Sequence, residues 1–437
     1  MAGPADPRAP VGLGRVFRLW FPLALSWGLM GCESPLFTMF VARMADQDIQ
    51  LAAWGSVVFP VALVVEGPII MLLAASTALC VDGEAYRKVR RFMWWSSGLL
   101  TLLHAAVAFT PLYDLVASGW IGAPAEVLEP GRLGLKIMLP WTAAIAYRRF
   151  QQGVLIRFER SRLVAAGTFV RMVTVVGFLA GGKYFEIGPG IVVGSLAIAA
   201  GVTAEAVFAG WCVQPVLRQR VFVAAPGKEP LSRRSFTRFY LPLAMTPLLT
   251  LLIQPAGSAA MSRMPDALPS LAVWSSVHGL VFLLRSTGFA YNEVVVALLG
   301  EPGAARALRR FAYVLGATTA GLLAVLAVTP LGEMMFRSVY GLRPELAALA
   351  ASAILFAVLM PAYQALQSWF QGVLVHERKT RGITEAVLLY VIVAVVGLAA
   401  GVAWSGWTGI LFAVCTFVVG GLLQTAWLAF RARHYIR

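Results

Sequence analysis

Long hydrophobic runs, separated by short polar segments, recur along the whole chain. Each run has roughly 20 or more residues, the length of an α-helix that crosses a bilayer. Segments of about ten residues with alternating hydrophobicity, typical of outer-membrane barrels, are absent. The pattern therefore predicts an all-α polytopic membrane protein with about twelve spans. These spans are 17–41, 51–80, 92–111, 133–156, 162–182, 188–214, 236–261, 271–299, 311–331, 346–375, 382–403 and 407–430.

The polar segments differ in charge from one side to the other. Of the 36 Lys and Arg residues, 25 lie on the side of the N-terminus, seven lie on the opposite side and four lie deeper within spans. Because basic residues stay in the cytoplasm, this alternation predicts that both termini are cytoplasmic and that the chain lies in the inner (cytoplasmic) membrane. The N-terminal stretch has no apolar core with a cleavage site, so we expect the first helix to stay in the membrane.

Composition agrees with a membrane protein. The chain is 59% hydrophobic and 13% charged, whereas soluble domains carry about 25% charged residues. The formal net charge of +15 is explained by the cytoplasmic loops, so we expect no nucleic-acid partner.

The sequence repeats itself. Residues 43–57 read RMADQDIQLAAWGSV and residues 263–277 read RMPDALPSLAVWSSV. Further matches, at offsets of 219 and 220, are Pro22-Leu23-Ala24 with Pro242-Leu243-Ala244, Pro35 with Pro255, and Gln152-Gly153-Val154-Leu155 with Gln371-Gly372-Val373-Leu374. A duplication of six helices explains them. It predicts an N-terminal bundle at 1–214, a cytoplasmic linker at 215–235 and a C-terminal bundle at 236–437, related by a pseudo-twofold axis with a shared cleft.

The repeated phrase places an arginine and an aspartate at the outer end of a span in each half. Arg43 and Arg263 can snorkel to the interface, and Asp46 and Asp266 begin the loop. We interpret the phrase as a helix-end anchor and turn, with an outer gate as the alternative.

Acidic residues within the first two spans are candidates for ion coupling or gating, because charge in the bilayer is costly. Glu33 lies deep in span 1 beside Pro35, which frees a backbone carbonyl and bends the helix. Glu66 precedes Gly67-Pro68, which predicts a local break in span 2. The repeat aligns Glu66 with Arg285, which predicts a salt bridge, either gating or permanent.

Basic residues within spans are candidates for substrate binding. Arg285, Arg148 and Arg171 would make a cavity electropositive, and guanidinium groups suit a carboxylate or phosphate. Arg149 points about 100° from Arg148, so at most one of the two aims into the cleft. For Arg171 we also expect an internal partner, with Glu205 the candidate. The amides of Gln152 and Gln254 could line the same cavity.

Enzymatic and cofactor-dependent functions are disfavoured. The four histidines form no HExxH, and neither a GxSxG elbow nor a Walker-type GxxxxGK[ST] loop is present. The four cysteines are scattered singly in apolar runs, so we expect packing rather than a metal site. The prediction is a protein that is not an enzyme and holds no cofactor.

Two six-helix repeats resemble the multidrug/oligosaccharidyl-lipid/polysaccharide (MOP) exporter superfamily. The start of each half resembles multidrug and toxic compound extrusion (MATE) proteins, with Pro22 and Pro242 in the first span, a short polar outer loop and a long second span. GCESPLFTMF followed by LAAWGSVVFPVALVVEGPI also resembles the progressive ankylosis family, with a glutamate in the first span and a Gly-Pro midway along the second. The resemblance implies a V-shaped, MATE-like fold and export by alternating access.

Several substrate classes stay open. The buried arginines favour a small organic anion, as in the ankylosis family. Glu33 and Glu66 favour MATE-type efflux of a cation in exchange for protons or sodium. A lipid-linked oligosaccharide would also suit a cationic cavity, and an intramembrane scaffold or enzyme is the alternative from another class. The expected partners are a small-molecule substrate, a coupling ion (proton or sodium) and membrane lipids, with the chain a monomer.

Overall fold

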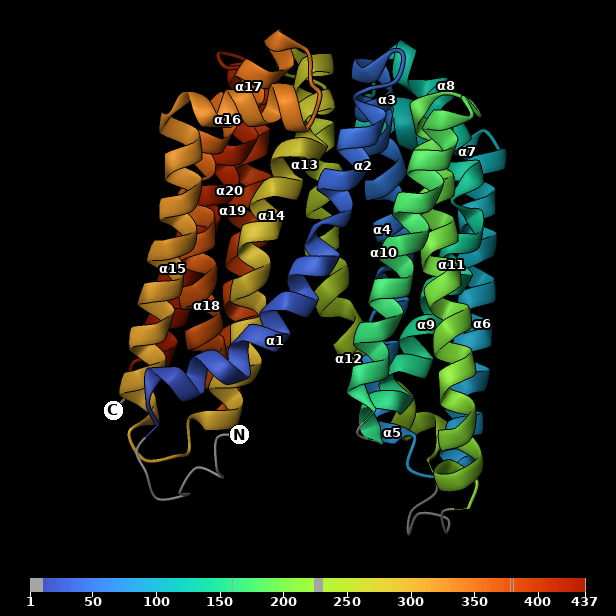
Figure 1. Ribbon diagram of the computed structural model, residues 1–437, viewed down its shortest axis with the longest axis vertical. Coiled ribbons are helices and arrows are strands. Elements are labelled where there is room, and N and C mark those ends of the chain that lie inside the picture. Colours follow the sequence, from blue (N-terminus) through green and yellow to red (C-terminus); the bar gives the residue numbers. More distant parts are fainter. Residues whose placement is uncertain (1–10, 159, 224–230, 378, 380, 437) are drawn as a thin grey trace. The chain divides into compact units, whose positions relative to one another are not determined.

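The computed structural model describes residues 11–158, 160–223, 231–377, 379 and 381–436. Within these ranges every regular element is helical (Figure 1). Residues 1–10, on which the expectation about the N-terminus rests, lie outside the described residues, as do residues 224–230 of the predicted linker. The all-α polytopic architecture predicted from the hydrophobic runs is confirmed.

The six spans predicted in the first half are all found as helices. The second span runs through α3, α4 and α5 with a π-helical turn, η1, and a 3-10 turn, η2, between them. The bounds are α1 Leu13–Gly31, α2 Glu33–Val41, α3 Gln47–Ala53, η1 Trp54–Val58, α4 Phe59–Glu66, η2 Gly67–Ile69, α5 Leu72–Leu79, α6 Gly83–Phe109, α7 Leu112–Asp114, η3 Leu115–Ile121, α8 Ala125–Ile137, α9 Leu139–Arg157, α10 Ser161–Tyr184, α11 Gly190–Val216 and η4 Leu217–Val221.

The second half follows the same order. Its elements are α12 Arg233–Leu251, α13 Ile253–Met261, α14 Ala267–Leu298, α15 Ala304–Val328, α16 Pro330–Met334, η5 Met335–Val339, α17 Pro344–Ala357, α18 Leu359–His376, α19 Arg381–Trp404 and α20 Gly409–Ala432. By length and composition, nine spans among the described residues could cross a membrane. The other three predicted spans are found as pairs of shorter helices, α1–α2, α8–α9 and α12–α13.

Prolines fix where the paired helices break. Proline lacks an N–H and clashes with the carbonyl four residues before it. The helix α1 ends at Gly31, four residues before Pro35, and α12 ends at Leu251, four residues before the matching Pro255. The break predicted at Gly67-Pro68 is also present, as η2.

The chain forms two compact units by its contacts. Unit 1 comprises Met1–Pro35 and Ser276–Arg437, and unit 2 comprises Leu36–Ser275, of which the structure describes the ranges given above. This division differs from the predicted halves, because the first span of each repeat contacts helices of the other repeat. In unit 1, the indole of Trp20 donates to the Thr287 carbonyl (2.8 Å). In unit 2, the Tyr240 hydroxyl donates to the Pro68 carbonyl (2.6 Å).

Unit 2 is built around α9, which packs against α5, α6 and α11. Gly153 permits the contact with α5, since a Cβ there would lie 2.3 Å from the Leu73 carbonyl oxygen and 1.9 Å from the Ser76 hydroxyl. Thr77 of α5 also donates a hydrogen bond to the Gly153 carbonyl (3.1 Å). The repeated Gln-Gly-Val-Leu motif thus has a packing role in this half.

The repeated Arg-Met-x-Asp phrase ends a helix in both halves. Asp46 and Asp266 both adopt left-handed backbone, with φ of 52° and 55°. The Arg263 guanidinium donates to the carbonyls of Trp120 and Ile121, both at 2.8 Å, at the end of η3 in unit 2. Arg43 donates to the Met39 carbonyl of its own helix. These bonds support the helix-end interpretation of the phrase.

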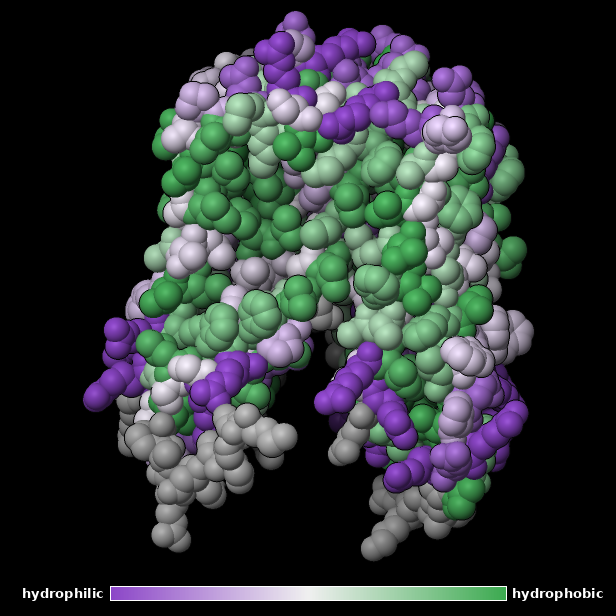
Figure 2. Space-filling model, viewed as in Figure 1, coloured by the Kyte–Doolittle hydropathy of each residue, from purple (hydrophilic) through white to green (hydrophobic). Residues whose placement is uncertain are grey.

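The surface of each unit matches a membrane environment. In the view of Figure 2, hydrophobic residues cover the middle of each unit, and hydrophilic residues gather at its two ends. Large apolar side chains that would be unfavourable in water, such as Trp95 and Trp211, are exposed on this protein. A multi-pass membrane protein keeps such side chains in lipid.

Candidate functional site: arginines within the membrane spans

In unit 2, a buried carboxylate binds two arginines. Glu205 of α11 is fully buried, and its Oε2 accepts a hydrogen bond from Arg148 of α9 (2.6 Å). Arg171 of α10 lies 3.7 Å from the same oxygen. The other oxygen, Oε1, accepts from Gln152 (2.9 Å) and Thr168 (3.4 Å). We call these five residues the Glu205 cluster.

Helical spacing explains how three helices build the Glu205 cluster. Arg148 and Gln152 are four residues apart on α9, and Thr168 and Arg171 are three apart on α10, so each pair shares a helix face. Both faces turn toward α11, which packs against α9 and α10. The internal pairing considered for Arg171 and Glu205 is present, and Arg148 belongs to the same pairing.

Arg149 lies outside the Glu205 cluster. It points about 100° away from Arg148 around the helix, is half-buried, and makes no hydrogen bond or ion pair with any described residue. Glu66, buried at the end of α4, interacts electrostatically with both Arg148 and Arg149. Of the two neighbouring arginines, the sequence interpretation favoured Arg148 for substrate binding, whereas the geometry leaves Arg149 the more available cation.

In unit 1, an arginine is bound by neutral groups. Arg285 of α14 donates to the amide oxygen of Gln364 on α18 (2.7 Å). Its guanidinium carbon lies 5.8 Å from the ring centroids of both Phe289 and Tyr363. No carboxylate among the described residues of unit 1 forms an ion pair with it. We call Arg285, Gln364, Phe289 and Tyr363 the Arg285 site.

The Arg285 site combines a charged hydrogen-bond donor with two aromatic faces. Cation–π contacts and a neutral acceptor lower the cost of a guanidinium within the bilayer but leave its positive charge uncompensated. A planar guanidinium with free donors can bind a carboxylate or phosphate through two hydrogen bonds. The arrangement is therefore suited to an anion.

The acidic candidates and their prolines lie at helix breaks. Glu33 begins α2, directly after the break at Cys32, and Pro35 packs in unit 1 near Gly279 of α14. Glu66 ends α4 and Pro68 lies in η2, both in unit 2. Gln254 lies half-buried on α13 in unit 2. The predicted pairing of Glu66 with Arg285 joins residues of different units and stays a prediction.

Sequence reasoning missed the partners of Arg285. Gln364, Gln367 and Gln371 recur at spacings of three and four in the apolar run of α18, which is the signature of one polar helix face. Gln364 binds Arg285, and the Gln367 amide donates to the Gly421 carbonyl (3.1 Å) and to Thr425 (3.0 Å) of α20. The polar stripe could have identified α18 as the partner helix.

Comparison with known proteins identifies the fold. No protein-family model and no curated protein matches the sequence. Among solved structures, an inward-facing MATE family multidrug resistance transporter of the MOP superfamily is 17% identical, with a TM-score of 0.69 over 95% of this chain and 98% of that one. The lipid II flippase MurJ is 12% identical, with a TM-score of 0.69 over 95% of this chain and 87% of that one.

A third match is a MOP superfamily transporter from Pyrococcus furiosus, for which a binding pocket of reverse polarity and a different function have been suggested. It is 15% identical, with a TM-score of 0.64 over 99% of this chain and 98% of that one. The chain thus has the MATE-like fold of MOP superfamily transporters over nearly its whole length. None of the three solved structures is of a progressive ankylosis protein.

Proposed function

We propose that this protein is a secondary transporter that exports a small organic anion by alternating access. The Arg285 site is the observation that carries the proposal, because its cation has neutral partners within its unit. An uncompensated charge at membrane depth is costly unless a ligand of opposite sign completes the site. The MATE-like fold supports the proposal that the protein is a transporter, and the residues of the Arg285 site support the proposal that the substrate is negatively charged.

The proposal gives the arginines different tasks. Arg285 binds the substrate anion in unit 1. Within unit 2, Arg149 is the cation that is available to an anion, and Gln254 is a further polar residue of that unit. Arg148, Arg171 and Gln152 hold the interior of unit 2 through Glu205, and they affect substrate binding indirectly. Two buried guanidinium groups on one carboxylate are better explained as a structural ion-pair network than as a free binding site.

Coupling and gating are assigned to the helix breaks. Glu33 with Pro35, and Glu66 with Pro68, combine a carboxylate with a bend, as discontinuous transporter helices do at their ion sites. The coupling ion is a proton or sodium. If Glu66 and Arg285 pair, reversing both charges should restore the transport that each single reversal loses. If transport is not restored, the two residues do not pair.

The charge distribution and the hydropathy of the sequence support a membrane and an orientation for the protein. We place the protein in the inner membrane with both termini in the cytoplasm, as a monomer with lipids and a small solute as partners. Transport requires no chemical conversion of the substrate, so no enzymatic activity and no cofactor is assigned.

Reconstitution in liposomes tests the proposal. Purified protein is assayed for uptake of a panel of organic anions, organic cations and a fluorescent lipid-linked sugar, with and without a pH gradient. Uptake of anions alone would support the proposal. Cation uptake driven by protons would assign the protein to multidrug efflux, and transfer of the lipid-linked sugar between leaflets would assign it to lipid flipping. Either of these two results would overturn the proposal of anion export. If transport does not depend on pH and is unchanged in Glu33→Gln, the protein is not coupled to protons through Glu33.

A further inference from the structure

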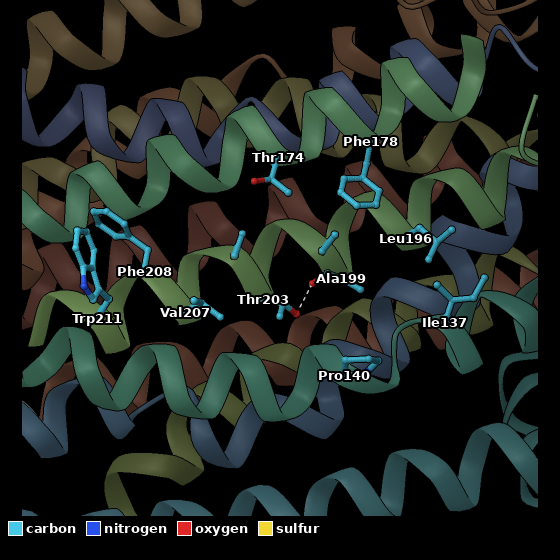
Figure 3. Close-up of a pocket in the computed structure, with 12 residues that line it drawn as sticks. Ile137, Pro140, Thr174, Phe178, Leu196, Ala199, Thr203, Val207, Phe208 and Trp211 are labelled. Carbon is cyan, nitrogen blue, oxygen red and sulfur yellow. Dashed lines mark hydrogen bonds between the residues drawn. The ribbon is translucent and has the colours of Figure 1, made fainter. Parts of the chain in front are cut away.

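A long groove runs over the outer side of α11 in unit 2. It encloses about 790 Å³, with α11 as its floor and with α10 and the α8–α9 junction as its walls (Figure 3). Small residues at Ala199, Ala200 and Ala204 leave the floor low, while Phe178 rises from α10 and Pro140 from α9. The break between α8 and α9 at Met138 lies between the two residues of this wall, Ile137 and Pro140.

The surface of the groove is apolar in effect. Its two hydroxyl groups both donate to carbonyls of their own helices, Thr203 to Ala199 (2.7 Å) and Thr174 to Val170 (2.9 Å). Neither hydroxyl therefore has a proton left to donate to a ligand. The remaining lining is apolar except for the indole N–H of Trp211 at one end, so a polar solute would lose most of its hydration in this groove, whereas a hydrocarbon chain loses nothing.

The groove is long enough to hold a whole acyl chain. Its floor extends along α11 from Leu196 to Trp211, about 22 Å at 1.5 Å per residue. This is longer than the hydrocarbon of one leaflet, which is about 15 Å, half of a core about 30 Å thick. A second groove of about 450 Å³ adjoins the first, because both are lined by Pro140, Thr203 and Val207. Two adjoining apolar grooves suit the two chains of one phospholipid.

Basic residues lie beyond the Trp211 end of the groove. Arg218 and Arg220 lie seven and nine residues after Trp211, both in the π-helical turn η4 that continues α11. Arg160 and Arg162 lie at the start of α10, which packs against α11. All four are exposed, and none forms an ion pair with a described residue. Such a cluster attracts an anionic headgroup.

We propose that this groove is a binding site for one anionic phospholipid, with its acyl chains along α11 and its phosphate at the basic cluster of Arg160, Arg162, Arg218 and Arg220. The lipid is a retained ligand, distinct from the lipids that exchange freely around the protein. The site is separate from the Arg285 site, which lies in unit 1, and does not depend on the proposed transport function.

Native mass spectrometry of the purified protein tests this site, with phosphatidylglycerol and phosphatidylcholine as probes. We expect one tightly held phosphatidylglycerol. The double variant Ala200→Leu/Ala204→Leu fills the floor and should weaken its retention at least about tenfold. Ala180→Leu, an exposed position of α10 that does not line the groove, should have no effect. Arg218→Gln/Arg220→Gln should abolish the preference for phosphatidylglycerol over phosphatidylcholine.

Three results would overturn the proposal. If the double variant and Ala180→Leu retain lipid equally, the groove holds only lipid that exchanges freely, and there is no specific site. A dimer that the double variant converts to a monomer would assign the groove to a second copy of the chain. If the double variant does not fold, phosphatidylglycerol with a photoreactive chain terminus can be applied to the unaltered protein. Adducts in the α11 segment 196–211 support the site, and adducts spread evenly over the lipid-facing helices contradict it.

Discussion

Arg148 and Arg285 both lie within membrane spans, but their surroundings differ. Arg148 in unit 2 is almost fully buried and binds a carboxylate that also serves Arg171. Arg285 in unit 1 is half-buried and binds an amide oxygen and two aromatic rings. The first arrangement pairs both guanidinium groups with a carboxylate and fixes three helices, whereas the second gives the guanidinium only neutral partners and leaves its charge for a ligand. An intramembrane arginine therefore indicates a binding site only when its own unit provides no carboxylate partner for it.

Removing the carboxylate of the Glu205 cluster should have the largest effect on stability. Glu205→Ala leaves the buried Arg148 guanidinium without its acceptor and removes the ion pair of Arg171, which costs about 3–5 kcal/mol. In detergent, the thermal unfolding midpoint of Glu205→Ala should lie well below that of the unaltered protein. Glu345→Ala, at an exposed position, should leave the midpoint unchanged. A midpoint close to that of the unaltered protein would mean that the Glu205 cluster does not hold unit 2 together.

Arg285→Gln should affect transport and spare stability. A hydrogen bond to a charged group contributes about 1.5–3 kcal/mol, so anion uptake should fall about tenfold to 100-fold. The substitution also removes the hydrogen bond to Gln364, but it removes the cost of a guanidinium at membrane depth as well, so the unfolding free energy should change by only about 1 kcal/mol. Arg285→Lys keeps the charge without the planar fork and should retain intermediate uptake. If Arg285→Gln lowers the unfolding midpoint as much as Glu205→Ala does, Arg285 is a structural residue, and the contrast between Arg285 and Arg148 does not hold.

Gly153→Ala should destabilise the unit that contains the Glu205 cluster. The added Cβ would clash with the Leu73 carbonyl of α5, and such overpacking costs about 1–3 kcal/mol. Gly98→Ala in α6 has no neighbouring atom within 4 Å and provides a matched control. Thermal unfolding of the two variants side by side measures the difference, and equal midpoints would contradict the close approach of α5 and α9.

The smallest effect concerns Cys80, which follows the last residue of α5 and reports on the same contact. Burial raises the pKa of this thiol to about 12, with Asp82 reinforcing the rise and Arg157 opposing it. The thiol is therefore protonated at neutral pH, and its alkylation should be slow and should accelerate only as the pH rises toward 12. Faster alkylation in Gly153→Ala would show that α5 has separated from α9. Rapid alkylation of the unaltered protein at pH 7 would contradict its burial.

The spans and their breaks were accessible from the sequence because both are local. Hydropathy sets the spans, and Pro35 and Pro255 set breaks four residues upstream. The division into units was not accessible, since it depends on which helices the first span of each repeat contacts. The Tyr240–Pro68 bond joins residues 172 apart, and no local pattern encodes it.

The candidate site was accessible only as a set of residues. Charge within apolar runs identified Arg148, Arg171, Arg285 and Glu205 and suggested the pairing of Arg171 with Glu205, but the partners of Arg148 and Arg285 depend on helix rotation. Arg148 and Glu205 are 57 residues apart and meet because α9 and α11 pack with these faces together. A rotation of α9 by about 100° would have placed Arg149, in place of Arg148, against Glu205.

The affinity of purified protein for an organic anion tests the account most directly. Equilibrium binding is measured for the unaltered protein, for Arg285→Gln, and for Arg310→Gln at an exposed arginine of α15 in the same unit. The account predicts a dissociation constant at least about tenfold higher for Arg285→Gln and unchanged for Arg310→Gln. Equal affinities in all three proteins would contradict it, because the charge of Arg285 would then contribute nothing to the binding of the substrate.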